Sequence, residues 1–497
     1  MNIAYNLDQS SMFFPDNPVF VFQDQTTTYS QLNLQVNQLA KGLENMGMEK
    51  GDRIAIFLPN IPEFVMIYFA AQKIGAIVVA LNVLLKKDEV RHILTDSGAR
   101  IIFAAKDQAV HIPIDEVDTL EKVIMVGDEK NDNGHINEIF DAAISDFTPQ
   151  QMDADDPAAI LYTSGTTGAP KGATLTQSNI ISNVNATICH IGMKTDDVIH
   201  LFLPLFHCFG QNFIMNACVK MGACMIMHQK FEPDPVVKAI SKYKVTMFFA
   251  VPTIYTYFLN MKDEDLDLSS IRYYFTAAAI MPTQVAEKWL DKYKIPIHDG
   301  YGLTESSPFA SYNHDLEYKL GSIGKPIMNV EMKIVDEDQK QVSDGKWGEI
   351  CIKGPNVMQG YWNQPEETAK AIKDGWLYTG DVGTIDEQGY YFVVDRIKDM
   401  IISAGNNIYP AEVENILYKH PLVLETAVFG KPDEIKGESV AAAVVLQPGG
   451  KLEPEELISF CRSKMAKYKA PRHIIFVDEL PKSPTGKILK RVLRQTL

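Results

Sequence analysis

The first third of the chain alternates short apolar runs with helix-like segments, and this alternation limits the fold more than any other feature of the sequence. Strand-like runs stand at 53–58 (RIAIFL), 76–82 (AIVVALN) and 100–105 (RIIFAA). Residues 63–75 and 90–100, which lie between them, have helix-like patterns. Strands that are apolar on both faces occur in parallel sheets whose two faces are covered by helices. The sequence therefore predicts an α/β architecture.

The pattern continues and then gives way to short strands separated by Gly and Asp turns. Further strand-like runs stand at 198–204, 223–229, 245–252 and 271–279. From about residue 320 the texture predicts a small β-rich subdomain over about 320–396. The remaining residues, 397–497, read as a compact α+β unit. We therefore expect an N-terminal domain over 1–396 and a C-terminal domain over 397–497.

Length, composition and charge narrow the class of protein. A chain of 497 residues is too long for one core, so roughly two to four domains or subdomains are expected. Its 46% hydrophobic and 22% charged residues exclude a disordered chain. A net charge of −16 argues against generic nucleic-acid binding. Residues 461–497 are locally basic, which fits either a solvated face or a lid over a phosphate-rich ligand.

The cysteines and the apolar runs indicate in which cellular compartment the protein is expected. Six Cys show neither a C-x-x-C pair nor a Cys/His metal spacing, so we expect reduced, buried thiols rather than a zinc site. The N-terminal residues lack the pattern of a signal peptide, and the longest apolar runs are shorter than a membrane span. These features predict a soluble, cytoplasmic protein. The oligomeric state stays open, a homodimer included.

A loop of small residues in LYTSGTTGAPKGATLTQSN, at 161–179, has the composition of an anion cradle. It is not the P-loop of NTPases, because counting from Gly165 puts Pro170, which has no N–H, where the second Gly belongs. The residue after Lys171 is Gly172 and not the Ser or Thr that would bind magnesium. The dinucleotide pattern G-x-G-x-x-G is absent as well. An ordinary surface turn would explain the glycines but not the ordered Ser, Thr and Lys content.

Four further motifs follow this loop in order. They are HDGYGLTESS at 298–307, WLYTGDVG at 376–383, YYFVVDRIKDMIISAGNNIYPAEVE at 390–414 and PKSPTGKILKR at 481–491. Together with the loop they resemble the adenylate-forming superfamily of acyl-CoA synthetases, coumarate-type ligases, luciferases and nonribosomal-peptide adenylation domains. The resemblance covers essentially the whole chain. It implies an N-terminal domain of doubly wound αβαβα subdomains with a β-barrel-like subdomain, and a mobile α+β C-terminal lid with its hinge near Lys398.

The resemblance also implies a reaction in two steps. ATP activates a fatty or similar apolar carboxylic acid as an acyl-adenylate, and the thiol of coenzyme A then takes the acyl group, with release of AMP and pyrophosphate. Two alternatives stay open at this point. One is transfer to the phosphopantetheine arm of an acyl carrier protein, and the other is a non-catalytic nucleotide or acyl-adenylate binder.

The motifs give each nucleotide contact a position in this sequence. The loop would hold the β- and γ-phosphates, and Lys171 would offset their charge. Thr304 resembles the contact to the α-phosphate, and Glu305, with Thr167, the ligands of Mg²⁺. The residues expected to bind ATP or AMP are Thr163, Ser164, Gly165, Thr166, Thr167, Gly168, Lys171, Ala278, Ala279, Asp299, Gly300, Tyr301, Gly302, Thr304, Asp381, Val393, Arg396 and Lys487.

Two of these residues carry most of the expected chemistry at the domain boundary. Asp381 resembles the carboxylate that accepts both ribose hydroxyls, since its two oxygens suit a vicinal diol. Lys487 would reach in from the lid and bridge the substrate carboxylate and the phosphate. The alternative for Lys487 is one more lysine in a basic tail. We expect Lys487, Thr304, Glu305 and His207 to be the catalytic residues.

The acyl and thiol sides rest on the resemblance alone. His207 aligns with a gate between the acyl pocket and the thiol tunnel, although a lone His in an apolar run is more often a packed core residue. The expected acyl-pocket residues are His207, Phe209, Val251 and Phe309, and those of the thiol tunnel are Ser403, Ala404 and Gly405. Ala404 and Asn406 depart from the common Gly and Glu of relatives, which leaves free coenzyme A or a carrier-protein arm as the acceptor.

Overall fold

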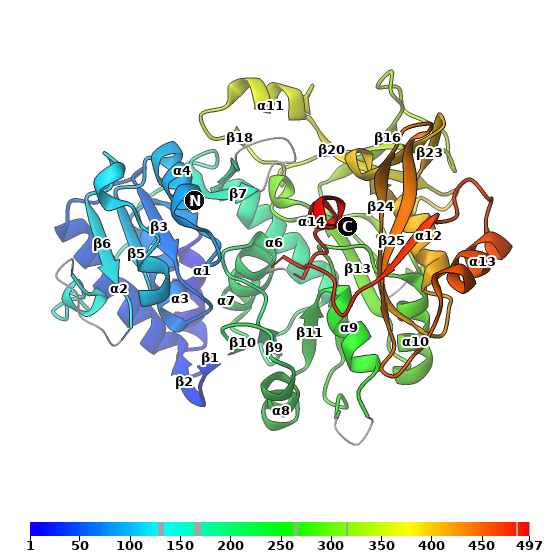
Figure 1. Cartoon of the computed structure of the whole chain (residues 1–497). Helices are drawn as coiled ribbons and strands as arrows, with labels where there is room; N and C mark the ends of the chain where they lie inside the picture. The colour runs from blue at the N-terminus through cyan, green and yellow to red at the C-terminus, as the bar shows by residue number, and fades with distance from the viewer. Residues whose placement is uncertain (128–133, 164–169, 263–265, 315–316, 484–485, 497) are drawn as a thin grey trace.

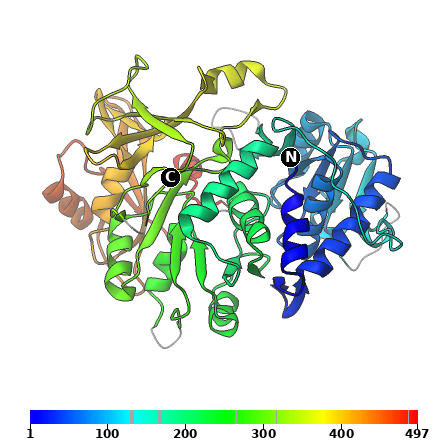
Figure 2. The ribbon, with the colours of Figure 1, turned by 180° about the vertical axis from the view of Figure 1, so that it is seen from behind.

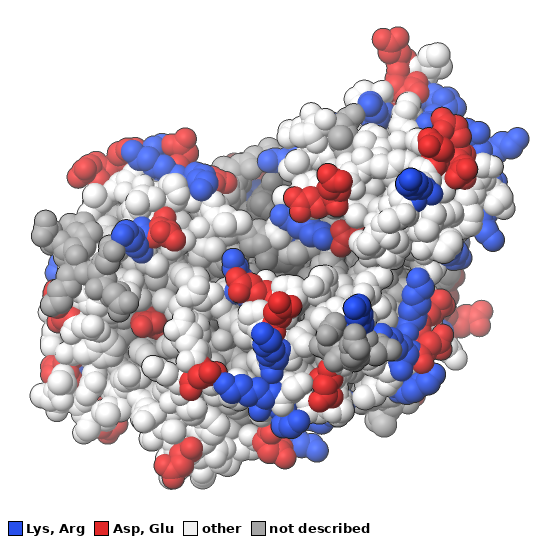
Figure 3. Space-filling model, turned by 60° about the horizontal axis from the view of Figure 1, so that its bottom comes forward, with Lys and Arg blue, Asp and Glu red and all other residues white. Residues whose placement is uncertain are grey.

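A computed structural model describes residues 1–127, 134–163, 170–262, 266–314, 317–483 and 486–496, and the strands of these residues form four sheets (Figure 1). The N-terminal residues, drawn in blue, lie at one side of the molecule in both views, and most of the C-terminal residues, drawn in orange and red, lie towards the other (Figure 2). Acidic and basic side chains are interspersed on the face that Figure 3 shows, rather than gathered by sign.

The first sheet has seven strands in the order β18-β8-β7-β4-β3-β5-β6. Its centre is parallel, and β7 and β8 form an antiparallel hairpin at one side. The strands are β3 (Arg53–Phe57), β4 (Ile77–Ala80), β5 (Ile101–Ala104), β6 (Lys122–Met125), β7 (Pro157–Thr163), β8 (Lys171–Thr176) and β18 (Gly360–Tyr361). The helical segments around this sheet are α2 (Tyr29–Asn45), α3 (Pro62–Lys73), α4 (Lys87–Ser97), α5 (Lys106–Ala109), η1 (Ile114–Glu116) and η2 (Ile136–Glu138).

Alternate residues of the central strands explain why both faces of this sheet are covered. Ile54 and Ile56 belong to the core cluster that contains α2 and α3, whereas Ala55 and Phe57 belong to a second cluster that contains α4. Successive side chains of a strand point to opposite faces, so an uninterrupted apolar run needs a helix on each side. This is the doubly wound arrangement that the sequence predicts.

A second, nine-stranded sheet has the order β15-β14-β13-β12-β11-β9-β10-β1-β2. Its strands are β1 (Pro18–Phe22), β2 (Gln25–Thr28), β9 (Val198–Leu201), β10 (Cys224–Met227), β11 (Met247–Ala250), β12 (Tyr273–Thr276), β13 (Ile297–Gly302), β14 (Phe309–Tyr312) and β15 (Lys325–Pro326). Its helical segments are α1 (Tyr5–Phe13), α6 (Gln177–Ile191), the π-helix η3 (Phe209–Asn216), α7 (Ala217–Met221), α8 (Pro233–Tyr243), α9 (Pro252–Leu259), α10 (Thr283–Tyr293) and η5 (Thr304–Ser306).

Two five-stranded sheets complete the fold. The β-rich part contains β16 (Glu331–Val335), β17 (Gly348–Lys353), β19 (Ile372–Lys373), β20 (Trp376–Ile385) and β21 (Tyr391–Arg396), with α11 (Pro365–Ala371) beside it. The short helix η7 (Ile397–Asp399) then leads into the C-terminal sheet of β22 (Ile401–Ser403), β23 (Asn406–Ile408), β24 (Val423–Asp433), β25 (Gly437–Leu446) and β26 (His473–Phe476). Its helices are α12 (Pro410–Leu417), α13 (Pro454–Lys464) and α14 (Lys490–Thr496).

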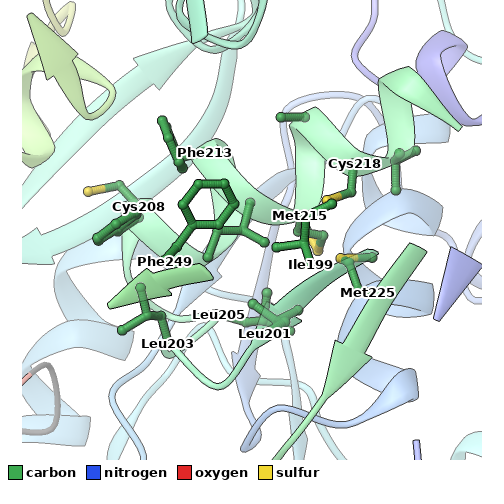
Figure 4. Close-up of a cluster of buried hydrophobic side chains, with 14 of the residues drawn as sticks. Ile199, Leu201, Leu203, Leu205, Cys208, Phe213, Met215, Cys218, Met225 and Phe249 are labelled. Carbon is green, nitrogen blue, oxygen red and sulfur yellow. The ribbon is translucent and has the colours of Figure 1, made fainter. Parts of the chain in front are cut away.

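The main core joins the two large sheets. Side chains of η3 and α7 pack onto β9, β10 and β11. Figure 4 labels Met215 of η3 and Cys218 of α7 together with Ile199 of β9 and Met225 of β10. A buried lysine ties the outer helices to this core. Lys73 at the end of α3 has no exposed surface, and its ammonium donates to Asp8 of α1 at 2.5 Å and to two Asn side chains of α2 at 2.9 and 2.6 Å.

The observed elements confirm the predicted fold class, and they differ from the sequence prediction in detail. The strand-like runs are one to five residues longer than the strands, because one or both ends of each run lie outside the strand: the run 271–279 contains β12, which spans only Tyr273–Thr276. Cys189 is exposed, so the expectation that the thiols are buried is wrong at that position. In the described part of the chain, no helix has the length and apolarity that crossing a membrane requires.

Candidate active site

The loop of small residues connects β7 to β8. Thr163 ends β7, and its hydroxyl lies 3.5 Å from the carbonyl oxygen of Lys171, the first residue of β8. The predicted phosphate contacts Ser164, Gly165, Thr166, Thr167 and Gly168 lie outside the described residues. Strand β18 continues this hairpin on its outer side, since Tyr361 pairs with Ala173. The two described ends of the loop therefore have fixed neighbours.

Lys171 contacts two residues, Glu367 and Tyr361, that belong to none of the sequence motifs. Its ammonium forms an ion pair with Glu367 of α11 and lies 5.1 Å from the centre of the Tyr361 ring. The Tyr361 hydroxyl donates to Oε1 of Glu305 at 2.9 Å. One tyrosine thus connects the expected phosphate-binding lysine with the expected magnesium ligand.

The turn after β13 brings Tyr301, Thr304 and Glu305 together, and glycines make its path possible. A Cβ on Gly302 would come within 1.8 Å of the carbonyl oxygen of Pro308, and one on Gly300 within 2.2 Å of the Phe275 ring. No side chain fits at either position. Thr304 and Glu305 follow in η5 and are each 9% exposed, so both can be reached from one side only.

Thr304 belongs to a small buried group with Cys208 and His207. The Cys208 sulfur lies 3.6 Å from the Thr304 hydroxyl and 3.8 Å from Nδ1 of His207. The backbone N–H of Phe209 donates to that Nδ1 at 3.2 Å. Burial, with a smaller contribution from Lys487, lowers the pKa of His207 to about 4. His207 is therefore neutral near pH 7, with its proton on Nε2.

Asp381 is held by residues from two other strands. Its Oδ2 accepts from the Tyr301 hydroxyl at 2.8 Å, and its Oδ1 accepts from Nε of Arg396 at 2.9 Å. Burial acts to lower the pKa of Arg396, but Asp381 and the other acidic neighbours together outweigh it, and the pKa lies above its ordinary value. Each carboxylate oxygen can accept a second hydrogen bond, so a diol can still be bound.

Lys487 of the C-terminal domain lies near Asp381 and Arg396. Burial, together with the nearby Arg396, lowers the pKa of Lys487 to about 8, while Asp381 opposes the shift. The preceding Gly486 lies against α9, where a Cβ on it would come within 2.7 Å of the Val251 side chain. Figure 1 shows this last segment, drawn in red, in front of the green strands and helices. The structure therefore brings Lys487 together with Asp381, Arg396 and His207.

The residues expected around the adenine lie on neighbouring strands. Asp299 of β13 pairs in register with Thr276 at the end of β12, just before Ala278 and Ala279. Burial raises the pKa of Asp299 well above its ordinary value. Ala278 adopts a φ of +70°, a left-handed conformation that turns the chain there. Val393 lies on β21, the strand that ends in Arg396.

Aromatic rings surround the expected acyl position. The Phe209 and Phe309 rings are 5.7 Å apart, centre to centre. Phe213 stacks on Phe275 at 4.9 Å and lies 4.4 Å from Phe309. Phe213 and Phe275 were not among the predicted pocket residues. Phe213 follows Phe209 by four positions in η3, and the two rings lie 5.3 Å apart, centre to centre. Val251 belongs to the same core cluster and also lies against Gly486 of the C-terminal segment.

The hairpin of β22 and β23, which carries the predicted thiol tunnel, bonds to its own domain. The N–H of Ala404 donates to the carbonyl of Lys436 at 2.8 Å, and Asn406 donates back to Ser403 at 3.3 Å. Ser403 is buried, whereas Ala404 and Gly405 are exposed. Lys398 lies in η7, between the β-rich sheet and the C-terminal sheet, and burial lowers its pKa.

Several residues of the site had no signal in the sequence motifs, among them Cys208, Tyr361 and Glu367. Tyr361 and Glu367 meet the site only through pairing with a distant segment, so a motif search could not have found them. Cys208 adjoins the predicted His207, but its contact with Thr304 depends on the packing of two distant segments. Across the described ranges, three or more His, Cys, Asp or Glu side chains nowhere gather into a group that could hold a metal ion.

Comparisons with known proteins cover the whole chain. Residues 7–362 match the family described as AMP-binding enzyme, and residues 412–487 match the AMP-binding enzyme C-terminal domain. A long-chain-fatty-acid–CoA ligase of Bacillus subtilis (strain 168) is 37% identical, over 98% of this chain and 93% of the relative. A feruloyl-CoA synthase of Amycolatopsis sp is also 37% identical, over 94% of this chain and 93% of the relative. The crystal structure of the anthranilate CoA ligase AuaEII in complex with anthranoyl-AMP superposes with a TM-score of 0.94 at 29% identity, and the match covers 100% of this chain and 97% of that one.

Proposed function

The chain belongs to the family of AMP-binding enzymes, and from this premise we propose that it is an AMP-forming acid–thiol ligase. It activates a fatty or similar apolar carboxylic acid with ATP and transfers the acyl group to coenzyme A. The observation that carries the proposal is the position of Lys487, a half-buried lysine of the C-terminal domain whose charge interacts with those of Arg396 and Asp381. A lysine of a basic tail with a structural role only would not need to lie near this arginine and carboxylate.

In the first step a carboxylate oxygen of the acid attacks the α-phosphorus, and the bond to the bridging oxygen of the β-phosphate breaks. Negative charge builds on the α-phosphoryl oxygens and on the leaving pyrophosphate. Lys487 stabilises the former, Thr304 donates its hydroxyl proton to an α-phosphate oxygen, and Lys171 offsets the latter. Asp381 holds the ribose hydroxyls and so sets the position of the α-phosphorus.

The residues present fit a magnesium ion bound with ATP. Among the described residues Tyr361 donates to only one carboxylate oxygen of Glu305, so the other is left for a hard cation. Thr167, which lies outside the described residues, is the second proposed ligand. Mg²⁺ takes most of its ligands from phosphate and water, so one or two protein oxygens suffice. When bound, it would neutralise phosphate charge during the displacement.

In the second step the thiolate of coenzyme A attacks the acyl carbon, and AMP leaves with the electron pair of the broken C–O bond. His207, being neutral, can lie beside the acyl carbonyl without adding charge. We propose that rotation about Lys398 exchanges the Lys487 segment for the hairpin at Ser403–Gly405, which then lines the path of the thiol. Transfer to a carrier-protein arm is the alternative at this step.

The aromatic cluster supports an apolar acid. Phe209, Phe213 and Phe309 offer rings and no charge to the part of the acid beyond its carboxylate. The two curated relatives are named for a fatty acid and for an aromatic acid, and both acids share this apolar character. ATP and coenzyme A as co-substrates lead us to propose a cytoplasmic location. The proposed site lies within one chain and needs no second copy.

Exchange of labelled pyrophosphate into ATP tests the proposal. The purified protein would be supplied with ATP, Mg²⁺ and, one at a time, medium- and long-chain fatty acids, benzoate and hydroxycinnamates. We expect exchange that depends on an apolar acid. Adding coenzyme A or a phosphopantetheinylated carrier protein to the best acid then identifies the acceptor by thioester formation. No exchange with any acid would contradict an adenylating enzyme and favour the non-catalytic binder.

A further inference from the structure

The ion pair between Lys171 and Glu367 is the least expected feature of the site. Lys171 has a side-chain exposure of 22% and Glu367 one of 30%, so both are partly shielded from water. Glu367 also forms an ion pair with Lys370, one turn further along α11. The hydrogen bond from Lys171 and then that from Lys370 lower the pKa of Glu367 to about 2. The carboxylate is therefore fully charged at neutral pH.

The backbone fixes this pair. Tyr361 of β18 pairs with Ala173, two residues after Lys171. The N–H of Tyr361 donates to the Thr368 hydroxyl at 2.8 Å, and that hydroxyl in turn donates to the carbonyl of Gln364 at 2.9 Å. α11 is thus anchored to the same hairpin edge that carries Lys171. This anchoring distinguishes Glu367 from a mobile carboxylate that meets a lysine by chance.

Resting on the proposed function, we propose that Glu367 is a positioning residue that competes with the β- and γ-phosphates for Lys171. The same ammonium serves two anions, and the negative carboxylate repels phosphates that share its lysine. Glu367 therefore weakens the hold of Lys171 on ATP and on pyrophosphate, and it recaptures the ammonium as pyrophosphate leaves. The Tyr361 ring keeps the ammonium in place during this exchange.

A competing carboxylate and an orienting carboxylate predict opposite effects on ATP affinity when the charge of Glu367 is removed. If Glu367 oriented Lys171 for the phosphates, removing its charge would weaken ATP binding. If Glu367 competes, removing its charge strengthens binding of ATP and pyrophosphate and slows pyrophosphate release. An ion pair of this exposure changes affinities by about twofold to fivefold.

The test compares Glu367→Gln with Glu366→Gln. Glu366 is the neighbouring carboxylate of α11, is exposed, and among the described residues forms no ion pair with Lys171. The measurements are the KM for ATP, the inhibition constant of pyrophosphate and the rate of pyrophosphate release after rapid mixing. We expect Glu367→Gln to lower both constants about twofold to fivefold and to slow release, with Glu366→Gln equal to the wild type. The difference should shrink at high salt, because partly exposed charges are screened.

Two results would overturn the proposal. One is a higher KM for ATP in Glu367→Gln, which means that the carboxylate assists Lys171. The other is an unchanged pyrophosphate constant. A double-mutant cycle excludes an indirect effect: in a Lys171→Met background the Glu367→Gln change should have no effect on either constant. Failure of the proposed function is separate, since the wild-type protein would then show no acid-dependent exchange at all.

Discussion

The pKa of Lys487 lies close to the pH at which the protein is expected to work. Its pKa lies at about 8 because the ammonium is buried and lies near Arg396, although Asp381 favours the charged form. Adenylation needs the charged form, so the amine proton is lost at a pH close to the working range. In the proposed function Lys487 is therefore both a charge stabiliser and a group that limits the reaction at high pH.

We expect kcat/KM for acid-dependent pyrophosphate exchange to fall as the pH rises through about 8. The Lys487→Arg variant keeps its charge throughout this range, so its residual activity should show no decline there. A pH profile of both proteins from pH 6 to pH 10 measures this. The same alkaline decline in Lys487→Arg would assign it to another group.

His207 links the site to acid stability. Burial, and then Lys487, lower the pKa of His207 to about 4, below its ordinary value near 6.5, so the unfolded state binds the proton more readily. The stabilising effect of the neutral form is complete above about pH 6.5 and is lost as the pH falls towards 4. Unfolding free energy should decrease by up to about 1.4 kcal/mol per pH unit in that window from this group.

Urea unfolding at pH 7, 6 and 5 of the wild type and of His207→Gln checks this contribution. The variant lacks the titrating ring, so the wild type should lose more stability than the variant between pH 7 and pH 5. Parallel losses in the two proteins would show that His207 is not the group responsible.

At the scale of elements, helices α1, α2 and α3 meet at the Lys73 ammonium. Its partners Asp8, Asn33 and Asn37 come from two different helices, and burial lowers the pKa of Lys73 while Asp8 opposes the shift. At the junction of these three helices, the hydrogen bonds of the Lys73 ammonium therefore connect the helices where apolar side chains would otherwise pack. Such a buried donor is strongly coupled to its acceptors, which lose their partner when it is removed.

The Lys73→Met change keeps most of the side-chain volume and removes the ammonium from three acceptors, of which Asn37 is buried and Asp8 and Asn33 are half-buried. We expect a loss of about 3 kcal/mol in unfolding free energy. Lys41→Met on α2 is the matched control, because among the described residues its ammonium pairs only with the exposed Glu44, and it should change stability by less than about 1 kcal/mol. Denaturant unfolding measures both. Equal small effects would mean that Lys73 does not hold the three helices together.

Some elements could be predicted from the sequence and others could not. The strands β3, β4 and β5 are readable because apolar runs of strand length alternate with helices. β18 has two residues and no periodicity, and it pairs with β8, which lies almost 190 residues earlier. The placement of Tyr361 and Glu367 depends on this pairing, so neither could be assigned to the site beforehand.

The same distinction applies to the site residues. Motifs fixed the chemistry expected of Thr304, Asp381 and Lys487, because each lies in a segment with characteristic neighbours. The role of Cys208 beside Thr304 is visible only once η3 and the turn after β13 are packed together. The π-helical turn of η3 has no signature in a pattern of apolar residues, and it sets where Phe213 points.

At the scale of the whole molecule, the C-terminal domain presents one of two surfaces. Lys487 lies with Arg396 and Asp381, while the hairpin of β22 and β23 bonds to its own domain. η7 with Lys398 is the short connection between the domains. We propose that this arrangement serves the adenylation step and that the hairpin approaches instead for the thiol step. The central claim is that Lys487 acts in the first of these steps only.

Separate measurement of the two half-reactions in Lys487→Ala tests this claim most directly. The first is acid-dependent pyrophosphate exchange, and the second is thioester formation from coenzyme A and a preformed acyl-adenylate. We predict that the variant loses at least about a hundredfold in the first, as when one charge-stabilising group is removed from a transition state, and stays within about threefold of the wild type in the second. Equal losses in both half-reactions would contradict the account.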